Sequence, residues 1–253
     1  MSARASLRII APSIALIVLL AAPREGVAQM SAPVPAKDTG AMEMEVPHGF
    51  FTHEGLPDAV GSFSLRTSGL ATRVDGKTQG DFAFHLETGL TKAIGLHIRN
   101  DRFLNSPMTE AMFQFAAITS SDGRSGFAPI IEFEFPTHSG AGSRINTLIG
   151  QTVKLANSRV AFNQVLHYNP REDMVDWSAS LVAVATPQFF PVLESLGEGG
   201  NDALPIVRLL AGFKVRVREG FLLGLAYQLP ITKNKEFSSQ VVIQPDVEWS
   251  TRR

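Results

Sequence analysis

His48 and His53, together with Met42 and Met44, form the densest group of potential metal ligands in the sequence. Imidazole and thioether donors in one short stretch would suit copper. A metal site also needs a fixed geometry and a sufficient number of ligands, and nothing in this pattern supplies them. We therefore expect no metal site and no cofactor.

Hydrolytic chemistry would need a serine beside a histidine, with a third group that orients the ring. His138, Ser139 and Ser143 lie close together in one expected loop, and His167 lies on an expected strand. None of them is flanked by a recognisable nucleophile motif. The sequence also contains no Gly-rich phosphate loop, HExxH pair or zinc-ligand spacing. We therefore expect no catalytic residues and no enzymatic activity.

Charged and polar residues that alternate with apolar ones form the third group. Unpaired ions in the dry core of a soluble β-sandwich cost several kcal/mol each. In the lumen of a barrel the same ions can pair across strands or meet water, so we predict that they face a lumen and set its polarity. Each could serve in a salt bridge of the wall or in contact with a solute. The predicted lumen-facing residues are Asp81, His85, Glu87, His97, Arg99, Glu132, Glu134, Asp176, Arg208, Lys214, Arg216, Arg218, Gln240, Gln244, Asp246 and Glu248.

The elements that must position these side chains are strands, in which successive residues point to opposite faces. Clear alternation occupies 81–90, 94–99, 113–116, 131–135, 175–183, 207–217, 221–229 and 235–249, and less regular runs occupy 61–72, 147–156, 159–168 and 188–196. The total is about twelve, and an even number suits a bacterial outer-membrane barrel. The sequence therefore predicts an all-β protein with a single transmembrane antiparallel up-and-down β-barrel of about 12 strands.

The last strand, 235–249, shows the alternation most clearly. Phe237, Val241 and Trp249 are expected to face lipid, with Trp249 near the periplasmic interface where aromatic girdles lie. Pro245 is awkward in a paired strand, because proline has no N–H for the ladder.

The connections between these strands alternate in length, as the two rims of an outer-membrane barrel require. Short periplasmic turns are expected near Thr91, Asp122, Asn157, Pro187 and Glu219, of which the turn at 120–125 is long for its rim. Longer outer loops are expected at 73–79, 101–107, 136–146, 169–173, 197–204 and 230–235. A β-sandwich has no reason to keep this alternation.

The N-terminus has the features of a secretory signal peptide. Arg4 and Arg8 precede an apolar run over 9–22, which is short for a membrane span, and cleavage is expected near Ala28. The expected organisation is a signal peptide at 1–28, a flexible N-terminal segment at 29–59, an outer-membrane barrel at 60–249 and a periplasmic tail at 250–253. The apolar pair Phe50–Phe51 suggests that the flexible segment tucks into the periplasmic mouth of the barrel.

The composition excludes several classes. The chain has no cysteine, so a disulfide framework, a lipoprotein anchor and a thiolate metal site are excluded. A formal net charge of -1 is too near neutral to suggest a nucleic-acid partner. The expected partners are the lipid bilayer of the outer membrane, the barrel-assembly machinery and a small-molecule solute that the sequence does not identify.

Several short motifs resemble the outer-membrane barrel family labelled MetA-pathway of phenol degradation, which is distantly similar to hydrophobic-compound outer-membrane transporters. The motifs are the turn at 87–91, the Gly220 hairpin, the strand end at 227–232, Glu236–Phe237 and the closing Trp249. The resemblance covers most of the chain from about Gly61. It implies a barrel in the outer membrane of a Gram-negative bacterium that passes small, aromatic or hydrophobic molecules, and it defines no substrate-binding residues. The tail at 250–253 departs from the usual end of such barrels, an aromatic residue that the assembly machinery reads.

Three functions remain open. The first is a channel or transporter whose lumen charges set what passes. The second is a closed structural or adhesion barrel that acts through its outer loops. The third is a soluble exported β-barrel that binds a small ligand. Twelve strands make a barrel wider than the eight whose side chains can fill the interior, although an inward N-terminal segment could plug it.

Overall fold

The computed structural model describes residues 46–104, 108–136, 145–200 and 204–251. The expected signal peptide at 1–28, Met42 and Met44 lie outside the described residues. The described residues form thirteen strands: β1 (Ser62–Val74), β2 (Lys77–Gly89), β3 (Ile94–Asn100), β4 (Met108–Phe115), β5 (Ile118–Thr119), β6 (Gly126–Pro136), β7 (Asn146–Ala156), β8 (Val160–Asn169), β9 (Met174–Ala183), β10 (Phe189–Gly200), β11 (Ile206–Arg218), β12 (Phe221–Pro230) and β13 (Ser239–Ser250). Within these described residues, no helix is long and apolar enough to cross a membrane.

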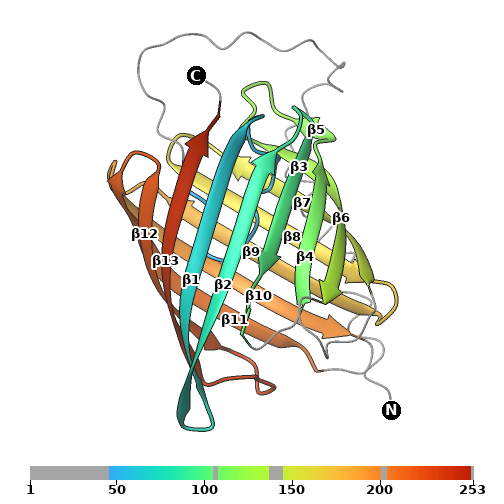
Figure 1. Cartoon of the computed structure of the whole chain (residues 1–253), viewed down its shortest axis with the longest axis vertical. Coiled ribbons are helices and arrows are strands. Elements are labelled where there is room, and N and C mark those ends of the chain that lie inside the picture. Colours follow the sequence, from blue (N-terminus) through green and yellow to red (C-terminus); the bar gives the residue numbers. More distant parts are fainter. Residues whose placement is uncertain (1–45, 105–107, 137–144, 201–203, 252–253) are drawn as a thin grey trace. The chain divides into compact units, whose positions relative to one another are not determined.

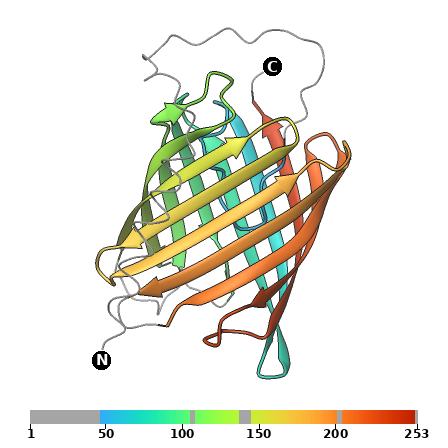
Figure 2. The same cartoon turned by 180° about the vertical axis from the view of Figure 1, so that it is seen from behind.

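Twelve of these strands form one closed antiparallel barrel. Each pairs with the next along the chain, β4 pairs directly with β6, and β13 returns to pair with β1. Figures 1 and 2 show the steep strands β1–β4 on one side and the strongly tilted strands β7–β11 on the other. The predicted all-β barrel of about twelve strands is confirmed.

The remaining strand, β5, is not part of the barrel and accounts for the long turn over 120–125. Ile118 and Thr119 pair with Phe127 and Gly126, so they extend the β4–β6 connection as a two-residue ladder beyond the barrel wall. The turn itself is held by Ser120, whose backbone N–H donates to Ser125 O at 2.8 Å. The extra length is therefore a small hairpin extension rather than an additional barrel strand.

The exterior of the barrel is apolar and exposed. In β12, for example, Leu223, Leu225 and Tyr227 are 44–49% exposed, whereas Leu222 and Ala226 are buried between them. This alternation places one face of each strand toward the inside of the ring and the other outside. An apolar outer face is what a barrel embedded in lipid presents.

A substitution at Leu225 can test whether the apolar outer face meets lipid. It lies in the middle of β12 between Phe213 of β11 and Ile243 of β13. Replacement of Leu225 by arginine is expected to cost about 2–4 kcal/mol of folding free energy in a bilayer, because a charge on the lipid face is penalised most at the midplane. The matched change Val217→Arg, at the end of β11, should cost about 1 kcal/mol or less. Denaturant titration of the barrel in phospholipid vesicles measures both, and equal costs would contradict a bilayer-facing exterior.

Pro245 is accommodated by a local gap in the ladder. Between β1 and β13, Arg66 pairs with Asp246 and Gly69 pairs with Ile243 in the same register. The two residues between these pairs on each strand are not paired. Because proline cannot donate a backbone hydrogen bond, the pairing is interrupted beside it and resumes unchanged.

The connection between β1 and β2 is shorter than predicted. The expected outer loop over 73–79 is wrong, since β1 continues to Val74 and β2 begins at Lys77. Asp75 and Gly76 form a two-residue turn with φ of 49° and 78°, and Asp-Gly is favoured there because both positions need a positive φ. The strand ends around this turn are polar and exposed, so no apolar alternation marked them.

The start of the last strand also differs from expectation. β13 begins at Ser239 rather than near Lys235, and Phe237 lies before it with only 6% of its surface exposed. The expectation that Phe237 faces lipid is therefore wrong. Trp249 is 43% exposed, and its ring stacks on Phe63 of β1 at a centroid distance of 5.4 Å.

The connections between consecutive strands define the two rims of the barrel. The rim that carries the turns after β2, β4, β7, β9 and β11 is called the short-turn rim below, and the opposite rim is called the long-loop rim. The start of β1 and the end of β13 both lie at the short-turn rim, which is at the top of Figure 1.

Candidate functional site

Residues 46–59, the plug segment, lie inside the barrel. They contain no helix or strand, yet most of them are buried, and Phe50 is completely inaccessible. Side chains from β1, β4, β7, β8, β10 and β13 all hydrogen-bond to this segment. Because these strands are spread around the whole ring, a segment that contacts all of them is enclosed by it; the blue trace inside the barrel in Figure 2 shows this.

Glu194 of β10 anchors the deepest part of the plug segment. Its carboxylate accepts backbone hydrogen bonds from Phe50, Phe51 and Thr52, at 2.8, 3.0 and 3.3 Å. Gly49 makes this approach possible, since a Cβ atom there would lie 1.9 Å from the Glu194 Oε1 atom. Three N–H groups that no ladder could satisfy are therefore satisfied by one wall carboxylate.

The carbonyl groups of the same turn are held from β1 and β13. The Arg66 guanidinium donates to the carbonyl oxygens of Gly49 and Thr52 at 3.1 and 3.3 Å. The Gln244 amide donates to the Phe50 carbonyl at 2.8 Å and to the Ser68 hydroxyl at 2.9 Å. Wall side chains thus replace the partners that a regular element would have supplied.

The second half of the plug segment is held from the opposite part of the wall. Gln114 of β4 donates to the Glu54 carbonyl at 2.9 Å, and the Thr152 hydroxyl of β7 donates to the Gly55 carbonyl at 2.9 Å. The Gly55 N–H in turn donates to the Asn163 side chain of β8 at 3.0 Å. The Glu54 carboxylate also pairs with Lys154.

One side of the interior is apolar. Phe50 and Phe51 pack in a buried cluster on β1, β2 and β9–β13, whose other members are Leu70, Ala83, Val182, Phe190, Val192, Leu210, Leu222, Ala226 and Val242. Gly224 of β12 leaves room for the Phe50 ring, because a Cβ there would lie 2.7 Å from a ring carbon. The plug segment therefore closes this side of the lumen with its aromatic rings.

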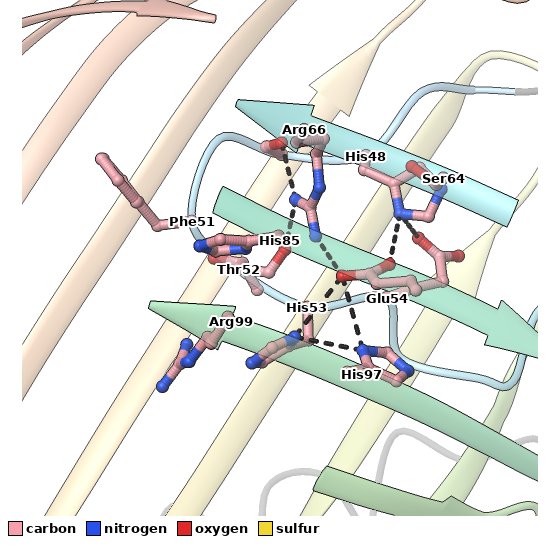
Figure 3. Close-up of polar contacts among 12 residues, drawn as sticks. His48, Phe51, Thr52, His53, Glu54, Ser64, Arg66, His85, His97 and Arg99 are labelled. Carbon is pink, nitrogen blue, oxygen red and sulfur yellow. Dashed lines mark hydrogen bonds and ion pairs between the residues drawn. The ribbon is translucent and has the colours of Figure 1, made fainter. Parts of the chain in front are cut away.

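The other side of the interior is charged and centres on Glu87 of β2. Its fully buried carboxylate pairs with Arg66 and lies 3.1 Å from His48 Nδ1. His53 Nδ1 and His97 Nδ1 each lie 3.4 Å from Glu87 Oε1. Figure 3 shows the three histidines and Arg66 gathered around this carboxylate, with His48 and His53 from the plug segment and His97 from β3.

The two plug histidines differ in charge. Burial opposes protonation of His48, but the Glu87 carboxylate raises its pKa to about 9, so His48 is an imidazolium at neutral pH. Burial lowers the pKa of His53 well below its ordinary value, and the charge of Arg99 lowers it further, so His53 is neutral. The plug segment thus presents one cation and one neutral imidazole to the wall.

Further contacts between polar side chains line the wall. Arg99 of β3 pairs with Glu110 of β4, and Lys214 Nζ of β11 lies 2.9 Å from Asp246 Oδ2 of β13 with both side chains fully buried. His167 Nε2 lies 3.4 Å from Glu132 Oε2. Because each pair joins neighbouring or next-but-one strands, these contacts link strands along the wall.

The predicted lumen residues occupy three environments. Nine are buried: Asp81, His85, Glu87, His97, Glu132, Lys214, Gln240, Gln244 and Asp246. Six are partly buried: Arg99, Glu134, Asp176, Arg208, Arg216 and Glu248. Arg218 is exposed at the end of β11, where a bulge shifts the register after Arg216. Of the sixteen, Glu87, His97 and Gln244 make polar contacts with the plug segment, the His85 ring stacks on the His53 ring, and Lys214 Nζ lies 5.4 Å from the centre of the Phe50 ring.

The sequence interpretation missed most of the residues that hold the plug segment. Arg66, Gln114, Thr152, Asn163 and Glu194 were not among the predicted lumen residues. Arg66, Asn163 and Glu194 lie in the less regular runs, where a polar residue beside an apolar neighbour was the available signal. Their role was not visible, because it consists of contacts with a segment far away in the sequence.

Of the hydrolase candidates, His138, Ser139 and Ser143 lie outside the described residues. His167 is buried on β8, where its Nε2 atom lies 3.4 Å from Glu132 Oε2.

Comparisons with known proteins identify the fold. No family model matches the sequence, and no curated protein matches it. Among solved structures, an outer membrane channel from Pseudomonas putida F1 is 8% identical, with a TM-score of 0.52 over 81% of this chain and 100% of that one. The KdgM porin in complex with disordered oligogalacturonate is 7% identical, with a TM-score of 0.50 over 76% of this chain and 99% of that one. The chain thus has the fold of barrels seen in outer-membrane channels.

Proposed function

We propose that this protein is an outer-membrane channel for small molecules whose lumen is gated by the plug segment. The observation that carries the proposal is the way the plug segment is held: side chains bind its backbone, and the twelve strands close without it. It can therefore leave the lumen without breaking the main ladders of the barrel.

The proposal includes an orientation. The short-turn rim is periplasmic and the long-loop rim faces outward, as in bacterial outer-membrane barrels. The plug segment joins β1 at the short-turn rim, where Val60 bridges to Gly89, so its C-terminal end lies on the periplasmic side in this orientation. This agrees with an exported precursor that loses residues 1–28 and is inserted in the outer membrane of a Gram-negative bacterium by the barrel-assembly machinery.

The solute class is proposed from the two-sided interior. The predicted polar residues other than Arg218 line the pathway, and displacement of the plug segment would uncover charged groups at Arg66, Glu87 and Glu194 opposite the apolar cluster around Phe190 and Leu210. A small molecule with an aromatic or hydrophobic part and a polar group would suit both sides. The resemblance to the MetA-pathway of phenol degradation family supports the same class.

A closed structural or adhesion barrel is the second candidate. It is favoured by the full burial of Phe50 and of the surrounding wall side chains, which shows that the lumen is filled at that level. In that case the plug segment stays in place permanently and the outer loops carry the function.

Electrical recording separates these candidates. The purified protein in planar bilayers is expected to show brief openings to a conducting state, and liposomes that contain it should take up small aromatic acids faster than sugars of similar size. An absence of both conductance and uptake would overturn the channel and leave the closed barrel. Recovery of the protein as a soluble periplasmic component, without heat-modifiable gel migration, would instead support the soluble ligand-binding barrel.

A further inference from the structure

Three ligand atoms meet in a nearly equilateral triangle inside the barrel. His53 Nδ1 and His97 Nδ1 lie 3.1 Å apart, and each lies 3.4 Å from Glu87 Oε1. With bonds of about 2.0–2.1 Å, two ligand atoms on a tetrahedral zinc ion lie about 3.3–3.4 Å apart. The three atoms therefore have the spacing of three corners of such a tetrahedron.

The arrangement of the donor atoms also suits a metal. The two Nδ1 atoms face each other and one carboxylate oxygen, so the three atoms converge on one point. A cation among the three atoms would bind both nitrogen lone pairs and the carboxylate oxygen together. The three side chains are 0–2% exposed, so water competes weakly for them.

The surroundings hold the carboxylate in position. His48 Nδ1 lies 3.1 Å from Glu87 Oε2, the oxygen that the triangle does not use. Arg66 pairs with Oε1, which has a second lone pair for the metal. Residues that hold a ligating carboxylate from outside are a regular feature of metal sites.

We propose that His53, Glu87 and His97 bind a divalent transition-metal ion of the zinc class, with a fourth position open to water. Two imidazoles and one carboxylate form a ligand set that zinc uses in open sites. In the sequence His53 lies beside His48 and the methionines at 42 and 44, whereas the other two ligands lie far away on β2 and β3.

The ion would fasten the plug segment to the wall, since His53 belongs to the plug and the other two ligands belong to the barrel. A metal that binds only the plugged state shifts the ratio of plugged to open barrel by about 100-fold when its concentration is 100 times its Kd. This consequence rests on the proposed function, whereas the binding of the metal does not.

Zinc titration of the purified, untagged protein in detergent tests the site. Calorimetry is expected to show one Zn²⁺ per chain for the wild type and loss of that binding for His53→Gln and His97→Gln. His48→Gln, which removes an outer contact only, should weaken binding by about 10–100-fold. His167→Gln is the matched control, because His167 is a buried wall histidine beside a carboxylate, outside the triangle, and it should bind like the wild type.

The possible outcomes distinguish metal binding from an effect of the metal on channel gating. Absence of stoichiometric Zn²⁺ binding, or binding that survives His53→Gln, would overturn the metal site. His53 lies outside the barrel strands, so this variant decides the matter even if His97→Gln fails to give a folded, heat-modifiable barrel. Stoichiometric binding that leaves conductance unchanged would uphold the site and overturn its role in gating; a zinc-dependent closure lost in His53→Gln would uphold both.

Discussion

Replacement of Glu194 by glutamine is expected to increase the ratio of open to plugged channel by about 10- to 100-fold. The wild-type carboxylate accepts three backbone N–H groups, from Phe50, Phe51 and Thr52. A glutamine offers one carbonyl oxygen and turns its NH₂ group toward the remaining donors, so at least one buried N–H loses its acceptor. Each such loss costs about 1–3 kcal/mol. The cost falls on the plugged state alone, because the N–H groups can reach water once the segment leaves.

Single-channel recording in planar bilayers measures this change as longer and more frequent openings. Glu198→Gln is the matched control: it lies on the same strand, nearer the long-loop rim, and pairs with Arg208 at 3.8 Å instead of with the plug segment. Its openings should resemble those of the wild type. If the Glu194 variant is folded and its openings are also unchanged, the plug segment is not the gate.

Replacement of Lys214 by methionine is expected to destabilise the barrel by about 3–5 kcal/mol. Lys214 and Asp246 are fully buried and form an ion pair of 2.9 Å between β11 and β13, across β12. Methionine preserves most of the side-chain volume but leaves the Asp246 charge buried without its cation. An uncompensated charge in such surroundings is far more costly than the loss of the pair as a whole.

Urea titration of the barrel folded in phospholipid vesicles measures the free energy of unfolding. The double variant Lys214→Met with Asp246→Leu should recover most of the loss, because it removes both charges together. Arg216→Met, two positions along the strand and partly exposed, should change stability little. Equal stability of Lys214→Met and the wild type would show that Asp246 reaches water or another cation.

The order and number of the barrel strands could be predicted from the sequence because the signal is local. The alternation of apolar and polar residues is a property of each strand alone, and it located runs at all twelve positions, including 207–217 and 221–229, which become β11 and β12. The prediction failed at the polar hairpin around Asp75 and Gly76, where that pattern is absent. It also failed at the start of β13, because the alternation continues into residues 235–238, which precede the strand.

The partners inside the barrel could not be predicted in the same way. Alternation marked Glu87, His97 and Gln244 as residues of the inner face, but it could not say that Glu87 faces His48, His53 and Arg66. Glu194, the main anchor of the plug segment, was missed. Such contacts join positions far apart in sequence and carry no period of their own.

The sequence by itself determined the class of fold. Successive side chains of a strand point to opposite faces, so residues that alternate between apolar and polar give the strand one apolar face and one polar face. Only the tertiary structure decided what the polar face meets. Closure of twelve strands creates a lumen too wide for wall side chains alone, and residues 46–59 enter it because buried wall groups satisfy their backbone. Those long-range contacts plug the barrel, and the local pattern could not determine whether its lumen is open or plugged.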